Sequence, residues 1–156
     1  MKFEHLVQIN DLLHPTAVPL TRNQLWQGLV YRAEAPMAFV EHIDEAEILL
    51  RHESGIHRRV LMGKLEVIDH IHYEHEVSVH YDTQPSELHL GGQMWMYIEE
   101  PQAGALFVRF IYETPHPEDS DPELDKYLSY LRSAWQEADI DTVREIRHLA
   151  DSGKLG

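Results

Sequence analysis

The sequence predicts an α+β fold in which a curved antiparallel sheet wraps around one long C-terminal helix. Between residues 45 and 114, apolar and polar residues alternate with a period of two, which is typical of strands. Between residues 121 and 152, apolar residues recur at three- and four-residue steps, as along one face of a helix. Because the strands are grouped and the helices stand near the ends, the pattern favours α+β over alternating α/β.

The C-terminal helix is the clearest element. Ser120 or Asp121 can cap residues 121–152, and Glu123 can close a capping box on Ser120. At 1.5 Å per residue the helix would be roughly 48 Å long. The apolar stripe of this helix is interrupted at residues 139–141 (Asp-Ile-Asp), where a bend can occur. Its members are Leu124, Leu128, Leu131, Trp135, Ala138, Val143, Ile146 and Leu149.

The N-terminal third predicts one strand and two short helices. Residues 2–10 alternate as a half-buried strand does. Thr21 is a suitable N-cap for a helix over 22–34, Pro36 ends that helix, and a second short helix is expected over 36–42.

About five antiparallel strands follow. Gly63 should form a bulge or a tight bend, and a turn is needed near 73–76 because twenty continuous strand residues would be unusual. Residues 101–104 predict a hairpin loop. The strands are expected over 45–53, 57–71, the run beginning at 77, 86–100 and 105–114.

Length and composition limit the function classes. The 156 residues fit one domain, 1–156, and 43% apolar content is enough for a core. Thirteen Lys and Arg against 27 Asp and Glu give a net charge of −14, which argues against nucleic acid and anionic membranes as partners. There is no cysteine, no membrane-length apolar run and no signal-peptide pattern, so we expect a cytoplasmic protein.

The 93–113 hairpin has two apolar faces. With a four-residue loop, paired residue numbers sum to about 205. We expect the methionine face to line a cavity under the helix, because flexible Met suits an adaptable pocket, although ordinary core filling explains it too. The other face would be covered, most simply by a second subunit in a homodimer. The two faces are Met94, Met96, Ile98, Phe107, Arg109 and Ile111, and Trp95, Tyr97, Glu99, Leu106, Val108, Phe110 and Tyr112.

Arg109 is the charged member of the methionine face. A guanidinium in an apolar pocket needs a partner. A ligand carboxylate or enolate could bind it bidentately. The alternative is an internal salt bridge to Glu113, Glu100 or Asp69.

Twelve histidines raise the question of a metal site. His70 and His72 share a strand face, but buried neighbours of opposite parity place them on the solvent side, so we expect no metal and no cofactor. His5 lies on an apolar strand face and is either a core histidine or a general base. Glu99 and Glu100 are either a catalytic carboxylate pair, or one of them caps the hairpin while the other is exposed. No hydrolase or nucleotide-binding motif occurs.

The element order resembles the helix-grip fold of the START/SRPBCC superfamily, and the sequence is similar to its AtaL-like group. The resemblance implies a deep cavity between sheet and helix; superfamily relatives bind lipids, sterols or polyketides there, and some cyclise or aromatise them. It gives no catalytic motif to transfer. The segments that carry it are 3–10, 20–29, Arg32-Ala33-Glu34, 98–101, 106–110 with Tyr112-Glu113, and 138–143 with Ile146-Arg147.

Three hypotheses follow. The first is a binding protein for an apolar molecule with an acidic or phenolic group. The second is a cyclase- or aromatase-type enzyme, in which Arg109 or Tyr97 stabilises an enolate and His5 or a carboxylate moves a proton. The third is an interaction module that uses the outer hairpin face. The expected ligand-binding residues are Met94, Met96, Ile98, Phe107, Arg109, Ile111, Leu131 and Trp135, and no catalytic residue is assigned.

Overall fold

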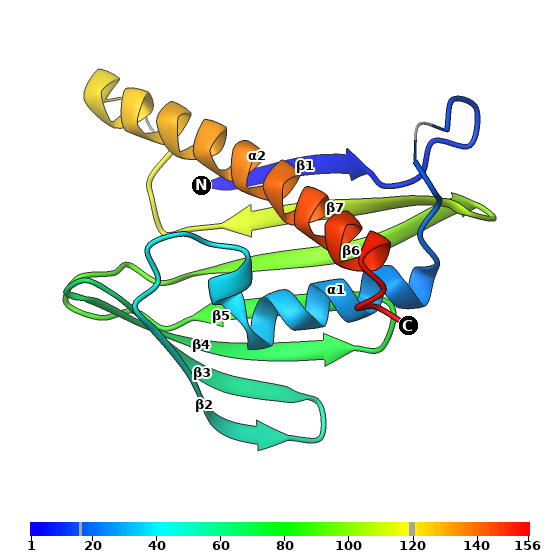
Figure 1. Cartoon of the computed structure of the whole chain (residues 1–156). Coiled ribbons are helices and arrows are strands. Elements are labelled where there is room, and N and C mark those ends of the chain that lie inside the picture. The colour runs from blue at the N-terminus through cyan, green and yellow to red at the C-terminus, as the bar shows by residue number, and fades with distance from the viewer. Residues whose placement is uncertain (16, 119–120) are drawn as a thin grey trace.

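The fold is the predicted α+β arrangement, a curved seven-stranded antiparallel sheet that holds a long C-terminal helix (Figure 1). The computed structural model describes residues 1–15, 17–118 and 121–156. The elements are β1 (Lys2–Gln8), α1 (Arg22–Glu34), the 3₁₀ helix η1 (Pro36–Ala38), β2 (Glu45–His52), β3 (Gly55–Met62), β4 (Leu65–Glu74), β5 (Ser78–Thr83), β6 (Gly92–Gln102), β7 (Ala105–Glu113) and α2 (Pro122–Asp151).

The first strand lies beside the last one. The sheet order is β1-β7-β6-β5-β4-β3-β2, with Lys2 opposite Glu113 and Gln8 opposite Phe107. In Figure 1, α2 crosses the sheet over β1, β7 and β6, and α1 lies below its C-terminal half. Residues from both ends of the chain therefore meet on the inner face of the sheet.

Helix α1 begins as predicted and approaches α2 closely. Thr21 caps it: its hydroxyl accepts from the N–H of Gln24 at 3.0 Å, and the Gln24 side chain accepts from the N–H of Thr21 at 2.9 Å. Gly28 faces α2, and a Cβ there would come within 2.6 Å of Ile146. This absence of a side chain lets the two helices meet, and it brings Arg32, one turn later, next to α2.

Three predicted elements are shorter than expected. The strand over 57–71 is a hairpin that turns at Gly63, where a positive φ of 61° makes the turn easy for glycine. The strand over 86–100 begins only at Gly92, and the helix over 36–42 is a single 3₁₀ turn. The turn near 73–76 is confirmed, since β4 ends at Glu74 and β5 begins at Ser78.

The register predicted for the β6–β7 hairpin was wrong by one residue. Met94 pairs with Tyr112 and Ile98 with Val108, so paired numbers sum to 206. A bulge between Glu99 and Gln102 absorbs the extra residue before a tight turn. A one-residue shift moves every side chain of one strand to the other face. The inner face therefore holds Met94, Met96, Ile98, Leu106, Val108, Phe110 and Tyr112, and the outer face holds Trp95, Tyr97, Glu99, Phe107, Arg109 and Ile111.

Helix α2 continues without a break through residues 139–141. Asp121 is its N-cap and accepts from the N–H of Glu123 at 3.2 Å, while Ser120 lies outside the described residues. Asp139 is fully buried instead of marking a bend. Within the described ranges, no helix combines the length and apolar character needed to cross a membrane.

Candidate functional site

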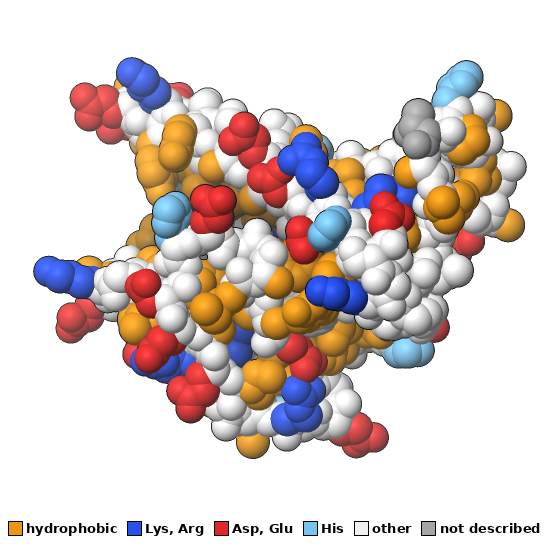
Figure 2. Space-filling view, viewed as in Figure 1, with side chains coloured by type: hydrophobic (Ala, Val, Ile, Leu, Met, Phe, Trp, Pro, Cys, Tyr) orange, Lys and Arg blue, Asp and Glu red, His pale blue; other side chains and the backbone are white. Residues whose placement is uncertain are grey.

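A cavity of about 360 Å³ lies under α2, at the edge where β6 begins and β7 ends. Figure 2 shows a hollow with apolar side chains between the start of α2 and the segment that follows α1. Its wall combines apolar side chains with a few polar ones, as small-molecule sites usually do. The wall residues most relevant to its chemistry are Arg32, Arg58, Asp69, Tyr81, Met94, Tyr112 and Trp135.

One end of this cavity holds a closed ion pair between Arg58 on β3 and Asp69 on β4. The Nε of Arg58 donates to one carboxylate oxygen at 2.8 Å, and the hydroxyl of Thr83 donates to the other at 2.5 Å. The Nη1 of Arg58 also donates to the carbonyl of Ala33 at 2.7 Å. Both side chains are almost inaccessible to solvent, at 10% and 5% exposure. Each charge is thus compensated within the protein.

Arg32, in the last turn of α1, is a cation of a different kind. Its Nε donates to the hydroxyl of Thr142 on α2, and its Nη1 donates to the hydroxyl of Tyr81 on β5, both at 3.0 Å. The guanidinium is 5.5 Å from the centre of the Tyr81 ring, and that of Arg58 is 5.0 Å from it. In the described ranges no carboxylate forms an ion pair with Arg32. Its formal charge therefore faces the cavity with neutral partners.

Asp139 on α2 is a buried carboxyl group that makes no ion pair with an arginine among the described residues. Its side chain is inaccessible to solvent. The hydroxyl of Tyr112 donates to one oxygen, and the Nδ1 of His5 lies 3.3 Å from the other. The indole of Trp135 stacks on the ring of Tyr112, with centroids 4.2 Å apart and planes inclined by 3°. Tyr112 thus separates Asp139 from the cavity and links it to the cavity wall.

The surroundings of Asp139 bring its titration close to neutral pH. Burial raises its pKa from 3.8 to about 6, while the Tyr112 hydrogen bond and the charges of Arg32 and His5 limit the rise. Burial and the adjacent carboxylate also raise the pKa of Tyr112. A carboxyl group with such a pKa can exchange a proton near neutrality, which is characteristic of functional sites.

Five of the eight predicted ligand-binding residues lie on the cavity side. Met94 and Trp135 line the cavity. Met96 and Ile98 point the same way but are buried in the adjoining core, and Leu131 is half-buried on α2. The inward orientation of the β6 methionines is therefore as predicted.

The other three predicted residues lie on the opposite side of the sheet. The register shift places Phe107, Arg109 and Ile111 on the outer face. There Arg109 donates to Glu99 at 2.5 Å and to Glu4 at 3.3 Å. The prediction of an internal salt bridge was right in kind, but both partners differ from the three expected. The placement of Arg109 inside the cavity was wrong.

The histidines of β4 point outward, as predicted. His70 stacks on His57 with ring centroids 3.8 Å apart. The ring centroids of His72 and His80 are 5.8 Å apart, and His80 stacks on Trp95. Among the described residues no three His, Asp or Glu side chains are grouped to hold a metal ion.

Sequence reasoning missed Arg32 and Asp139, the two residues that distinguish this cavity. Asp139 stands one turn after Trp135, on the stripe that faces the sheet. An acidic residue at a buried helical position is a usable signal, because carboxylates are rarely buried without a partner. Arg32 gave no such signal, since its contacts to Tyr81 and Thr142 join residues 49 and 110 positions apart.

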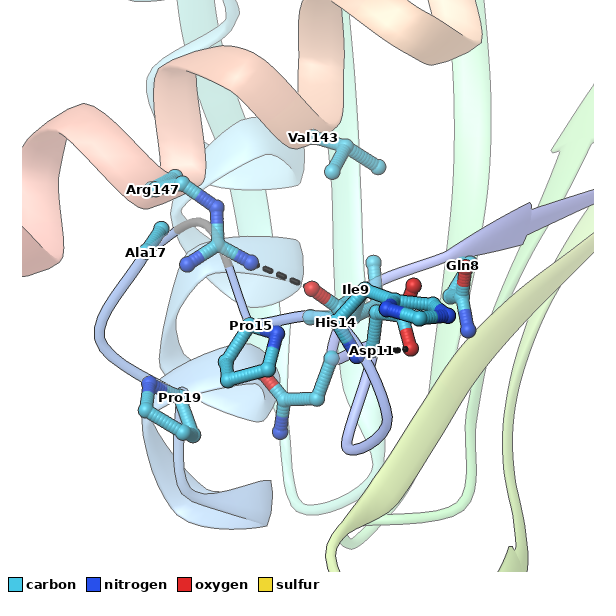
Figure 3. A pocket seen from close by; sticks show the side chains of 10 residues that line it. Gln8, Ile9, Asp11, His14, Pro15, Ala17, Pro19, Val143 and Arg147 are labelled. Atoms are coloured by element: carbon cyan, nitrogen blue, oxygen red, sulfur yellow. Dashed lines mark hydrogen bonds between the residues drawn. The ribbon is translucent and has the colours of Figure 1, made fainter.

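Of the other hollows in the part of the chain that the structure describes, two adjoin α2. One, of about 440 Å³, is bordered by the loop after β1; there the guanidinium of Arg147 points toward the carbonyl of Ile9, to which it donates (Figure 3). Arg147 also donates a hydrogen bond to the carbonyl of Val18, so it contacts this loop at two points. The other hollow, of about 500 Å³, lies between residues 37–41 and α2 and shares Arg32 with the cavity.

Sequence comparison gives one family. The sequence profile described as "Acetylaranotin biosynthesis cluster protein L" (AtaL) matches residues 7–153. Among proteins with curated descriptions, none is significantly similar in sequence.

Solved structures share the fold at low sequence identity. The Zhui aromatase/cyclase from Streptomyces sp. R1128 has a TM-score of 0.68 and 10% identity over 97% of this chain and 93% of its own. A START superfamily protein from Mycobacterium smegmatis has a TM-score of 0.60 and 12% identity over 93% of this chain and 98% of its own. The Aha1 dimer from Colwellia psychrerythraea has a TM-score of 0.62 and 11% identity over 94% of this chain and 96% of its own. At these identities the likeness shows the helix-grip fold.

Proposed function

The chain belongs to the AtaL family, and from this premise we propose that it binds an apolar, acidic small molecule, lipid- or polyketide-like, in the cavity between the sheet and α2. Arg32 holds the acidic group, while Met94 and Trp135 contact the apolar part. The observation that carries the proposal is the position of Arg32, a half-buried cation on the cavity wall whose side-chain hydrogen bonds go to two hydroxyls.

The electrostatics of the two arginines support an anionic ligand. A guanidinium away from water is costly unless an anion compensates it. Asp69 compensates Arg58 by direct contact. Arg32 has only the hydroxyls of Tyr81 and Thr142 within hydrogen-bond reach among the described residues, and Asp139 acts on its charge only through space. A carboxylate or enolate beside Arg32 would form charge-assisted hydrogen bonds in a site of low dielectric constant.

The second candidate function is catalysis in the same cavity, of the cyclase or aromatase type. It is favoured by Asp139, which meets Tyr112 and His5 beside the wall that holds Arg32. In this reaction class a base takes a proton from carbon and a cation stabilises the enolate that forms. Faster hydrogen–deuterium exchange at the carbon between the carbonyls of a 3-oxo acid, lost in Asp139→Asn, would favour the enzyme over the binding protein.

The third candidate is a docking function of the outer face of the β6–β7 hairpin. Trp95, Tyr97, Phe107 and Ile111 are only half-buried there. A second copy of the chain is the simplest partner, and one relative of similar fold is itself described as a dimer. Light scattering coupled to size-exclusion chromatography distinguishes a homodimer from a monomer. We also propose a cytoplasmic location, on the absence of cysteine.

The test of the first proposal uses two fluorescent probes that differ in charge. 1-Anilinonaphthalene-8-sulfonate carries a sulfonate, and N-phenyl-1-naphthylamine has the same rings without it. Arg32→Met should weaken binding of the sulfonate roughly 10- to 100-fold, because a charge-assisted hydrogen bond contributes about 1.5–3 kcal/mol. Binding of the neutral probe should change by less than about threefold, because its rings need only the apolar wall.

The matched control is Arg51→Met, which removes the same charge from an exposed position on β2, where Arg51 pairs with Glu34. It should leave the affinity for both probes unchanged. Equal effects of Arg32→Met on the charged and the neutral probe would contradict an anion site at Arg32.

A further inference from the structure

The two residues that distinguish the cavity are connected through one turn of α2. Asp139 and Thr142 are three positions apart and therefore lie on the same face of the helix. Thr142 accepts a hydrogen bond from Arg32, and Asp139 accepts one from Tyr112, which lines the same cavity. The anchor for a ligand and the buried carboxyl group are thus held by adjacent positions of one rigid element.

The charges that act on Asp139 come from few groups. His5 on β1 and Tyr112 on β7 contact it directly, and Arg32 on α1 acts on it through space. Farther along the cavity wall, Tyr81 on β5 is a neutral phenol, and the charges of Arg58 and Asp69 compensate each other. On α2 itself, Asp141 and Arg144 pair with each other at the surface. Besides the Tyr112 hydrogen bond and His5, Arg32 is therefore the permanent cation that stabilises Asp139 as a carboxylate.

We propose that binding of an anionic ligand at Arg32 is coupled to the uptake of one proton by Asp139. The inference rests on the function proposed above. When an anion binds Arg32, it cancels the positive potential that favours the ionised carboxyl group. A fully buried carboxylate cannot recover that stabilisation from water, so it binds a proton instead.

In each binding event the protein takes one anion and one proton from solution, and no bond to carbon forms. The net charge of the cavity is then the same before and after binding. His5 offers the path for the proton, since its ring lies 3.3 Å from Asp139 and its side chain keeps 18% exposure to solvent. The ligand class follows: an apolar acid that stays ionised when bound, such as a carboxylate or the enolate of a 1,3-dicarbonyl.

The coupling strengthens acid binding as the pH falls. Between the ligand-free and ligand-bound titrations of Asp139, affinity should rise by up to about tenfold per unit decrease in pH. Below pH 6, where Asp139 is already protonated in the free protein, the affinity should level off.

The experiment is calorimetric titration with 1-anilinonaphthalene-8-sulfonate at pH 7, in phosphate and in Tris. The sulfonate does not titrate near neutrality, so the difference between buffers reports protons taken up by the protein. We expect about 0.5–1 proton for the wild type, about none for Asp139→Asn, and the wild-type value for the control Asp141→Asn, an exposed carboxylate two positions away.

Two results would overturn the coupling. One is uptake that persists in Asp139→Asn, whether or not His5→Gln abolishes it. The other is no uptake by a wild type whose binding depends on Arg32. Should Asp139→Asn not fold, the pH dependence of wild-type affinity between pH 6.5 and 8.5 decides, and a flat profile overturns the proposal. Failure of the underlying binding function gives a different result, namely sulfonate binding that Arg32→Met does not change.

Discussion

The two ends of the cavity hold the same two residue types in opposite arrangements. At one end Arg58 and Asp69 are in direct contact. Thr83 donates a further hydrogen bond to Asp69, and Arg58 donates one to the carbonyl of Ala33. At the other end Arg32 and Asp139 make no ion pair: Arg32 bonds to the hydroxyls of Thr142 and Tyr81, and Asp139, behind the cavity wall, accepts from the hydroxyl of Tyr112. In the first arrangement each charge is compensated by contact, whereas the second leaves a cation on the cavity wall and a carboxyl group buried behind that wall, at some cost in stability. That difference is the physical basis for placing function at the second end.

The largest expected effect comes from breaking the closed pair. Arg58→Met should destabilise the protein by about 3–5 kcal/mol, because it leaves Asp69 buried without its counter-charge. Urea unfolding followed by circular dichroism measures it. The double variant Arg58→Met/Asp69→Asn should be less destabilised than the single changes add up to. Additive losses would mean that the pair is not a coupled unit and would weaken the contrast between the two ends.

The open end should respond in the opposite direction. Asp139→Asn should stabilise the protein at pH 8 by about 2–3 kcal/mol, since the amide keeps hydrogen bonds to Tyr112 and His5 without a buried charge. The native pKa of Asp139, about 6, lies above the unfolded value of 3.8. Its contribution is thus fully present below pH 3.8 and is lost as the pH rises through 6.

The gain from Asp139→Asn should accordingly shrink toward pH 4. Thermal and urea unfolding at pH 4, 6 and 8 give the profile, with Asp141→Asn as the surface control. A destabilised Asp139→Asn at pH 8 would show that the carboxylate is structurally required, like Asp69, and would remove the contrast.

The smallest effect concerns Tyr81, whose ring lies close to both guanidinium groups. Tyr81→Phe keeps the ring but removes the hydroxyl that accepts from Arg32. It should cost about 0.5–1.5 kcal/mol of stability and change sulfonate-probe affinity only a few-fold, because Thr142 still holds Arg32. Fluorescence titration of the variant measures the affinity. A loss as large as that of Arg58→Met would place Tyr81 with the structural end.

The fold could be predicted because periodicity is a local property. The alternation of β1, the cap at Thr21 and the apolar stripe of α2 each involve residues near in sequence. The register of the β6–β7 hairpin depends on a bulge after Glu99, which no residue pattern indicated. That single bulge decided on which side of the sheet Arg109 lies.

The site was predictable only in part, for the same reason. The β6 methionines and Trp135 could be placed from helix and strand period. Asp139 and His5 are 134 residues apart, and only folding brings them together. The sequence did contain an indication at Asp139, an acidic residue interrupting a buried stripe, but a bend explained that interruption equally well until the helix was seen to continue.

The measurement that tests the central claim most directly is a ¹³C-detected NMR titration of the Asp139 carboxyl carbon in the ligand-free wild type. We expect a pKa of about 6 for Asp139, raised mainly by its burial at the open end of the cavity. A pKa at or below the ordinary value of 3.8 would mean that Asp139 is compensated as Asp69 is. In that case the two ends of the cavity would not differ, and the argument for a ligand at Arg32 would lose its electrostatic basis.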